Sequence, residues 1–305
     1  MIKIVRTKIR KGLGNFLGLI LFQLFGKHEL LTKLDENKIL SLYFHNPSVK
    51  VFEATIKWLI KNDFHIITLN EFQYYFDKKK CNHRRTVFIS FDDAWLGNLD
   101  LINVLRKLNV PVTLFVAPQS IIDGQIWLEI VRSQFKQLSK DMTDGIKVED
   151  LKSLPFSKTH KLYEASKKKV EIKRRIMTKS QLLDFAKFAS IGSHTVNHPI
   201  LTNCEDSVVL KELNESERIL KDWGLDNINS FAYPNGSYNE NIINLIGNTN
   251  YKYAFTTKPH FIELSTQKNN FEIPRICIPD GFGKYENLAR MASAWGKIFK
   301  DQHNA

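Results

Sequence analysis

Two adjacent carboxylates, Asp92 and Asp93, follow the apolar run TVFIS in the stretch SFDDAW. Neighbouring negative charges repel each other, so the pair needs a positive charge nearby to stay ionised. A divalent cation would supply that charge if one carboxylate bound it and the other stayed free as a base. The alternative is that both acids cap the helix that follows, because Asp is a favoured N-cap residue.

A second set of candidate metal ligands is the pair His194 and His198 in GSHTVNHP. On a helical turn, a spacing of four residues places both imidazoles on one face, within reach of one ion. The spacing alone is weak, because surface and packing pairs of histidines are common. Together with a carboxylate, however, two histidines form a frequent ligand set for catalytic zinc. We therefore predict a site for one divalent ion, with zinc favoured over cobalt, nickel or manganese.

Short apolar runs rich in β-forming residues alternate with helical patterns from residue 38 onward. The predicted strands cover residues 39–44, 65–69, 86–91, 111–116, 189–193, 230–233, 253–257 and 274–278. The predicted helices cover residues 50–62, 70–76, 97–108, 127–138, 178–188, 206–223, 239–247 and 284–299. Without a glycine-rich nucleotide loop, this alternation favours an α/β fold, a (β/α) barrel of about seven parallel strands.

The candidate residues all follow predicted strands, which is where barrel enzymes carry their catalytic groups. His45 follows the first strand, the aspartates follow TVFIS, the histidine pair follows ASIGS, and PNGSY follows SFAY. We therefore expect these side chains to meet at one end of the barrel.

Three of these segments, FISFDDAW, IGSHTVNHP and FAYPNGSYN, resemble motifs of the polysaccharide deacetylase (NodB-homology) family of carbohydrate esterases. The similarity runs from ILSLYFHNP to EIPRICIPD and is closest in layout to the exopolysaccharide poly-N-acetylglucosamine deacetylases. It implies a distorted (β/α) barrel and metal-dependent removal of N-acetyl, less often O-acetyl, groups from glycans.

The resemblance also implies a role for each matching residue. Asp92 corresponds to the catalytic base, and Asp93 to a metal ligand beside His194 and His198. The segment FAYPNG would line the substrate groove and help to hold the oxyanion through its backbone. The predicted substrate-binding residues are Trp95, Tyr233, Pro234, Asn235 and Gly236.

A general acid and an orienting arginine complete the expected site. The late histidine motif of many family members is absent, and the context of His260 does not match it. One branch takes this histidine from the first strand, so LYFHNP points to His45, although Phe44 replaces the usual tyrosine; the alternative is a loop histidine bonded to backbone. Arg275 resembles the late arginine that orients Asp92; the alternative is a surface salt bridge.

Two departures from the family pattern are expected to affect the substrate groove rather than the metal. Ala94 stands where glycine is usual, and Asn235 replaces an aromatic residue. Both therefore bear on which substrate is accepted.

The net charge of +12 is concentrated in two segments of the 305-residue chain. Residues 1–12 hold five basic and no acidic residues, and residues 158–175 hold eight basic against two acidic residues. Because these segments carry eleven of the twelve net charges, the rest of the chain has no general basic surface, and we expect no nucleic-acid partner. Residues 158–175 fall within a predicted inserted helical arm at about 140–176. Its basic residues are interpreted either as a solvated helix face or as a contact to anionic lipid or substrate.

The N-terminal segment 1–37 is predicted to contain an amphipathic helix. Its apolar residues recur on one helical face: Leu13, Phe16, Leu17, Ile20, Leu21, Leu24 and Phe25. We interpret residues 1–26 as a helix lying on anionic lipid; the alternatives are an export signal and a helix packed on the protein's own core. The deacetylase barrel would follow at 38–281, and a C-terminal helix and tail at 282–305.

The predicted function is a metal-dependent deacetylase for a polysaccharide or lipid-linked glycan in bacterial surface polysaccharide or lipopolysaccharide assembly. The expected location is the cytoplasm, peripheral to the inner face of the membrane, since the three cysteines are not spaced as a disulfide framework. The alternatives are an exported peptidoglycan or exopolysaccharide deacetylase, an inactive glycan-binding protein on the same barrel, and another metal hydrolase such as a phosphoesterase. The oligomeric state stays open.

Overall fold

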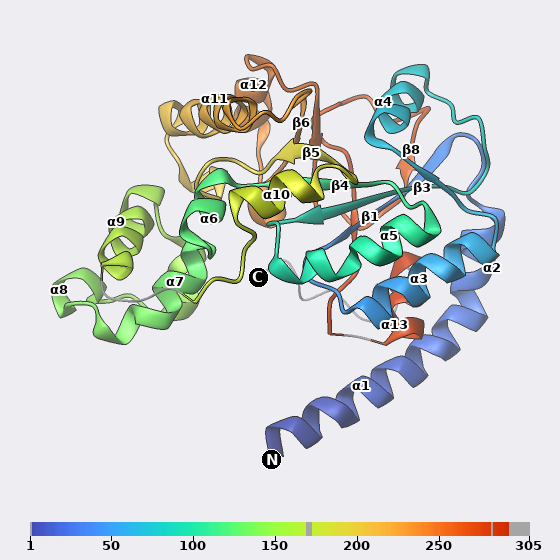
Figure 1. Cartoon of the computed structure of the whole chain (residues 1–305), viewed down its shortest axis with the longest axis horizontal. Helices are drawn as coiled ribbons and strands as arrows, with labels where there is room; N and C mark the ends of the chain where they lie inside the picture. The colour runs from blue at the N-terminus through green and yellow to red at the C-terminus, as the bar shows by residue number, and fades with distance from the viewer. Residues whose placement is uncertain (1, 169–172, 282, 293–305) are drawn as a thin grey trace.

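A computed structural model describes residues 2–168, 173–281 and 283–292 (Figure 1). Its strands are β1 (Lys38–Phe44), β2 (His65–Ile67), β3 (Thr86–Asp92), β4 (Val112–Val116), β5 (Ala189–Ser193), β6 (Ser230–Ala232), β7 (Tyr253–Phe255), β8 (Ile262–Glu263) and β9 (Ile276–Cys277). They form one sheet in the order β7-β6-β5-β4-β3-β1-β8, in which β2 also pairs with β3 and β9 with β1. Only β8 runs antiparallel to its neighbour among the described strands. The eight predicted strands are present, and β8 is an addition.

The sheet curls because one segment, 270–278, bonds to both β7 and β1. On the β7 side, Ala254 N–H donates to the Asn270 carbonyl at 2.8 Å, and Thr256 N–H donates to the Ile273 carbonyl at 2.7 Å. On the other side, β9 pairs in parallel with β1. The result is a curled, mostly parallel sheet with surrounding helices, which confirms the predicted distorted barrel.

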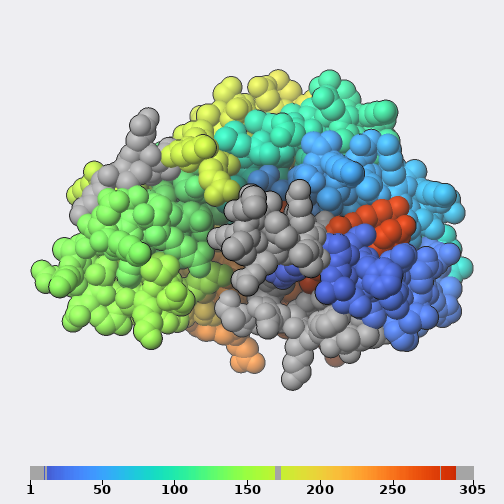
Figure 2. All heavy atoms as spheres, turned by 90° about the horizontal axis from the view of Figure 1, so that it is seen from below, coloured from blue at the N-terminus to red at the C-terminus, as the bar shows by residue number. Residues whose placement is uncertain are grey.

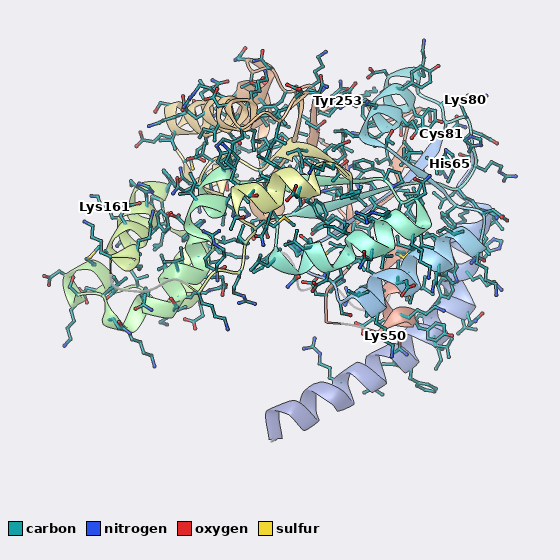
Figure 3. The ribbon with its side chains drawn as sticks, viewed as in Figure 1. Lys50, His65, Lys80, Cys81, Lys161 and Tyr253 are labelled. Carbon is teal, nitrogen blue, oxygen red and sulfur yellow. The ribbon has the colours of Figure 1, made fainter. Side chains whose placement is uncertain are left out.

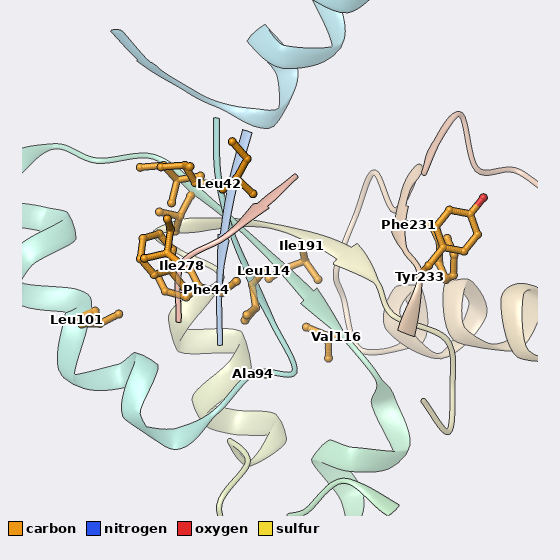
Figure 4. Close-up of a cluster of buried hydrophobic side chains, with 14 of the residues drawn as sticks. Leu42, Phe44, Ala94, Leu101, Leu114, Val116, Ile191, Phe231, Tyr233 and Ile278 are labelled. Atoms are coloured by element: carbon orange, nitrogen blue, oxygen red, sulfur yellow. The ribbon is translucent and has the colours of Figure 1, made fainter. Parts of the chain in front are cut away.

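Alternate residues of β3 face opposite sides of the sheet, as the two-residue period of a strand requires. Ile89 and Phe91 belong to the large apolar cluster between the sheet and its helices, part of which Figure 4 shows. Phe88 instead stacks on Phe255 of β7 at 5.4 Å, in a second cluster that is rich in aromatic residues. Because β3 and β7 are not neighbours in the sheet, this contact crosses the barrel interior. By the same period, Asp92 falls on the interior side at the carboxyl end of β3.

Helices cover the sheet at the positions that the sequence predicts, with shifts at their ends. Thr178 and Gln181 form a capping box at the start of one helix, and Thr68 and Glu71 form another. The predicted helix 97–108 begins as a 3₁₀ helix over Leu96–Leu101. The helices are α1 (Ile2–Leu21), α2 (Lys27–Thr32), α3 (Val49–Lys61), α4 (Leu69–Lys78), α5 (Ile102–Leu108), α6 (Pro118–Asp123), α7 (Trp127–Gln134), α8 (Lys140–Thr143), α9 (Phe156–Lys167), α10 (Lys179–Phe185), α11 (Asp206–Asp222), α12 (Glu240–Gly247) and α13 (Lys284–Met291). The predicted helix 284–299 continues beyond α13 into residues that lie outside the described ranges.

The predicted inserted arm forms a helical lobe beside the barrel, made of α7, α8 and α9 (Figures 1 and 2). In this lobe α9 packs on α7, a helix that precedes the predicted arm in the sequence. Lys161 lies on the outer side of α9 and is exposed (Figure 3). Trp127 ties the arm to the barrel because its indole Nε1–H donates to the His198 carbonyl at 2.8 Å.

The N-terminal helix α1 packs on α13, so the first and last described helices lie together. A π-helical segment, Phe22–Gly26, joins α1 to α2. Phe22 is buried, and its ring meets that of Trp58 edge to face at 5.4 Å. Among the described residues, no helix is both long enough and apolar enough to cross a bilayer.

Candidate active site

The carboxyl ends of β1, β3, β5 and β6 open into one cavity of about 790 Å³. The parallel strands therefore bring together side chains that lie far apart in sequence, as predicted. All the acidic and imidazole side chains assigned from the sequence line this cavity: His45, Asp92, Asp93, His194 and His198.

Asp92 is paired with Arg275 inside the barrel. Two parallel hydrogen bonds join them, from Nη1 to Oδ1 at 2.7 Å and from Nη2 to Oδ2 at 2.9 Å. Burial favours the neutral carboxyl, but the charge and hydrogen bonds of Arg275 and the neighbouring histidines together outweigh it, so the pKa of Asp92 is lowered. The side chain of Arg275 has no solvent exposure, which excludes the alternative of a surface salt bridge.

Arg275 is itself held from every side. Its Nε donates to the Thr256 carbonyl at 3.1 Å, and its Nη1 also donates to Ser90 Oγ at 3.1 Å. The guanidinium carbon lies 4.5 Å from the centre of the Tyr43 ring. These contacts compensate a buried cation and fix the direction from which it meets Asp92.

Asp93, His194 and His198 form a second group whose ligand atoms lie within 4.8 Å of one another. Asp93 Oδ1 is 3.2 Å from His198 Nε2 and 3.7 Å from His194 Nε2, yet among the described residues it accepts no well-aligned hydrogen bond. Ligands bound to one tetrahedral ion at ~2.0 Å lie about 3.3 Å apart. Two imidazole nitrogens and a buried carboxylate oxygen at this spacing fit a zinc-like divalent ion.

Outer contacts orient this group toward a shared point. His194 Nδ1 lies 2.6 Å from the Ala232 carbonyl, which only accepts, so Nδ1 carries the proton and Nε2 keeps its lone pair. Burial and neighbouring His198 lower the pKa of His194 to about 4, which keeps the ring neutral near pH 7. Trp95 Nε1–H donates to Asp93 Oδ2 at 3.1 Å, which leaves Oδ1 toward the histidines. Trp95 thus orients Asp93 in addition to lining the cavity.

The loop that carries both histidines is not helical, in contrast to the turn assumed for the HxxxH spacing. Thr195 and His198 have φ values of +64° and +57°. Glu212 of α11 holds the loop instead, since its Oε2 accepts the N–H groups of Val196 at 2.9 Å and Asn197 at 2.8 Å. Sequence reasoning missed Glu212, because a buried acid in an amphipathic helix carries no signal that separates it from an exposed one.

The turn after β3 explains why glycine is usual at position 94. Asp93 and Ala94 both have positive φ, +75° and +58°, a region that favours glycine. The Ala94 side chain is fully buried in the large apolar cluster and is not among the residues that line the cavity. The expectation that its methyl group adjoins the groove is therefore wrong.

His45 follows the last residue of β1, and hydrogen bonds hold the backbone at His45 and Asn46. Its carbonyl accepts Asn98 Nδ2–H at 2.8 Å, and the next N–H, of Asn46, donates to Asp280 Oδ1 at 2.9 Å. Within the described residues no hydrogen bond reaches its imidazole nitrogens, so the ring is open to the cavity it lines. Asp92 lines the same cavity. Asp280 and Asn98 were not predicted.

In the predicted groove segment FAYPNG, the N–H of Asn235 differs from the N–H groups beside it in its hydrogen bonding. The N–H of Tyr233 donates to the Phe255 carbonyl at 3.1 Å, that of Gly236 donates to the Tyr233 carbonyl at 2.9 Å, and Pro234 has none. Asn235 N–H has no such partner within the described residues. Among the backbone N–H groups predicted to hold the oxyanion, that of Asn235 is therefore the one still available.

Asn235 also connects the barrel to the arm. Its φ of +59° suits asparagine better than the aromatic residue that is usual in the family. Lys152, in the arm, donates from Nζ to Asn235 Oδ1 at 2.7 Å, and both residues line the cavity. Lys152 was not predicted. His260 lies outside this site, exposed and beside the carbonyl of Phe261.

Comparison with known proteins places this site in a family. The polysaccharide deacetylase family profile matches residues 79–254, more than half of the chain. The chain is similar to poly-beta-1,6-N-acetyl-D-glucosamine N-deacetylase of Staphylococcus aureus, with 28% identity over 244 residues that cover 77% of this chain and 69% of the relative.

Two solved structures share the fold. Streptococcus pyogenes deacetylase PplD in complex with acetate has a TM-score of 0.61 and 17% identity, covering 84% of this chain and 99% of its own. IcaB from Ammonifex degensii has a TM-score of 0.56 and 16% identity, covering 85% and 97%. From the family match and the shared barrel we conclude that this chain belongs to the polysaccharide deacetylase family.

Proposed function

We propose that this protein is a metal-dependent hydrolase that removes N-acetyl groups from a glycan containing N-acetylglucosamine, either a polysaccharide or a lipid-linked saccharide of the bacterial surface. The observation that carries the proposal is the meeting, in one cavity, of the Asp92–Arg275 pair with the Asp93, His194 and His198 group. The first supplies an ionised carboxylate and the second a set of metal ligands.

Each residue then has a separate task. A divalent ion held by Asp93 and the two histidines would supply Lewis-acid polarisation of the acetyl carbonyl and of water. Asp92, kept ionised by Arg275, accepts the proton of the attacking water. Asn235 N–H donates to the oxygen that becomes negatively charged.

His45 completes the reaction by donating a proton to the departing amine. An unprotonated amine is a poor leaving group, so an amide substrate needs such an acid, whereas an ester needs it less. The open imidazole at the cavity wall therefore supports an N-acetyl over an O-acetyl substrate. The name of the Staphylococcus aureus relative supports N-acetylglucosamine as the sugar.

Acetate release from a panel of glycans tests the proposal. The panel contains β-1,6-linked and β-1,4-linked N-acetylglucosamine oligomers and an O-acetylated glycan, each assayed after chelation and after zinc, cobalt, nickel or manganese is restored. We expect N-acetyl release that disappears on chelation and returns with metal. Release that survives complete removal of metal, or release from the O-acetylated glycan alone, would contradict the proposal.

A further inference from the structure

The helix α1 exposes an apolar stripe that the active site does not use. Five of the nine exposed large hydrophobic side chains of the described residues lie within residues 13–25. Successive members lie three, four, four and one residues apart, which keeps them on one side of the chain across the π-helical segment. They are Leu13 (59% exposed), Phe16 (59%), Ile20 (39%), Leu24 (66%) and Phe25 (49%).

The other side of α1 is fixed to the protein. A Cβ at Gly14 would come within 2.5 Å of Glu286 Oε2, and one at Gly18 within 2.5 Å of the Glu286 backbone. Leu21 is buried on this side, with 6% exposure. The apolar face predicted for α1 is therefore divided: Leu21 packs inward and the stripe faces solvent. The helix is thus packed closely on α13, with the stripe presented outward.

A run of basic residues precedes the apolar stripe in the sequence. Residues 1–12 hold five basic residues and no acidic one. Helices with a basic region next to an apolar face lie in the interface of anionic bilayers, with the apolar side chains at the headgroup–acyl boundary.

We propose that α1 docks this protein on the surface of an anionic lipid bilayer through residues 13–25, without crossing it. Apolar burial and the attraction of basic residues to anionic headgroups act together in such docking. A shallow insertion also agrees with the finding that no described helix can span a membrane.

The docking helix lies one helix away from the cavity. Asn15 of α1 accepts the Tyr285 N–H of α13 at 2.9 Å, and Arg290, five residues further along α13, lines the cavity. A docked protein therefore holds its cavity near the lipid surface. If the proposed deacetylase function is correct, on which this step rests, the favoured substrate is an acetylated saccharide anchored in that bilayer.

Flotation of the full chain with vesicles tests the docking without any assay of activity. We expect binding to phosphatidylcholine vesicles that contain phosphatidylglycerol, weak binding to phosphatidylcholine alone, and weakening by salt, which screens the charges. Phe16→Ser with Leu24→Ser should reduce binding more than about tenfold. The matched control is Ile122→Ser, 58% exposed on α6, which should bind as the unmodified chain does.

A second pair of variants isolates the charge. Lys3→Glu with Arg6→Glu should weaken binding about thirtyfold at low salt, and Lys211→Glu with Lys252→Glu, exposed elsewhere, should not. The proposal is overturned if the unmodified chain does not bind anionic vesicles, or if it binds both vesicle types equally. It is also overturned if the stripe instead forms a dimer interface, shown by a dimer in sedimentation that Phe16→Ser with Leu24→Ser dissociates.

Substrate presentation gives the last arm of the experiment. Acetate release from a glycolipid in anionic vesicles should fall severalfold in the Phe16→Ser, Leu24→Ser variant, while release from a soluble oligomer stays unchanged. Vesicle binding without acetate release from either substrate would sink the deacetylase proposal but leave the docking intact. Acetate release without vesicle binding would contradict the docking but leave the deacetylase proposal intact.

Discussion

The barrel interior below the cavity and the rim above it are held in contrasting ways. In the interior, Arg275 is fully buried and bonds to Asp92, Ser90 and Thr256. At the rim, Lys152 of the arm is half-buried and reaches the barrel side chains through its bond to Asn235. The interior is thus fixed by several simultaneous contacts, and the rim by few.

This difference separates chemistry from substrate choice. Groups that must meet a reacting atom need a fixed position, which the crowded interior provides. A wall made partly by an arm can change its contacts without disturbing that position. We therefore expect changes in the interior to lower the rate or the metal content, and changes at the rim to alter mainly the affinity for glycan.

The largest effect should follow loss of a metal ligand. His194→Ala removes one of three ligating groups, so both bound metal and acetate release should be lost, with metal affinity down more than about a hundredfold. Elemental analysis beside the acetate assay measures both. His260→Ala, at the exposed histidine outside the cavity, is the control and should keep both. Full metal content in His194→Ala would remove this histidine from the ligand set.

Loss of Arg275 should come next, because it leaves a buried carboxylate without its partner. Arg275→Met should lower the free energy of unfolding by about 3–5 kcal/mol at neutral pH. In the unmodified chain the lowered pKa of Asp92 means that the pair stabilises the fold above about pH 4, the ordinary carboxyl pKa, and less as pH falls through the lowered pKa.

In Arg275→Met the stability should depend on pH in the opposite direction. Burial without the cation raises the pKa of Asp92 above its ordinary value, so the stability of Arg275→Met should fall as pH rises through that raised pKa. Denaturant unfolding at several pH values measures the difference between the two proteins, which should grow from about pH 4 upward. Arg275→Lys, which keeps a charge, should recover part of the loss. A pH-independent difference would show that the pair is not ionised.

A smaller effect should follow from the loop that carries the histidines. Glu212→Gln replaces an oxygen that accepts two N–H groups, so metal affinity should fall about 10- to 100-fold, while activity at saturating metal stays near normal. A metal titration of activity shows whether this is so. Glu217→Gln lies on the same helix but bonds Lys221 and Asn250, and serves as the matched control. Equal metal affinity in the two variants would argue against the positioning role of Glu212.

The smallest effect is expected at the rim. Lys152→Met should raise KM about threefold and leave kcat unchanged, because it removes a contact to the groove and none to the reacting groups. Steady-state kinetics on an N-acetylglucosamine oligomer resolves the two constants. Lys161→Met, on the outer side of α9, is the control. A fall in kcat with unchanged KM would place Lys152 with the chemistry and end the distinction between interior and rim.

Strand alternation and motif position were sufficient to predict the barrel and the groups at its mouth. The period of β3 fixes the side on which Asp92 lies, and strand ends of a parallel sheet meet by geometry. The Arg275–Asp92 contact was also predicted, and the structure confirms it. The strand assignments come from local patterns, and the Arg275 contact comes from the resemblance to the family.

The rest depends on contacts between distant segments. Glu212 and Lys152 act through partners that no local pattern reveals. Likewise, nothing in the period of α1 showed that Gly14 and Gly18 would turn one side of the helix toward α13. Ala94 was placed wrongly because its positive φ, and with it the direction of its side chain, arises from the turn that closes on β3.

The central claim is that the adjacent acids divide the work, with Asp93 in the ligand set and Asp92 on the attacking water. Asp92→Asn tests it most directly, with acetate release and bound metal measured on the same preparation. We predict a rate lower by about 10²- to 10⁴-fold, the usual contribution of a general base, with metal content equal to that of the unmodified protein. A near-normal rate, or a loss of metal in parallel with the rate, would contradict this division.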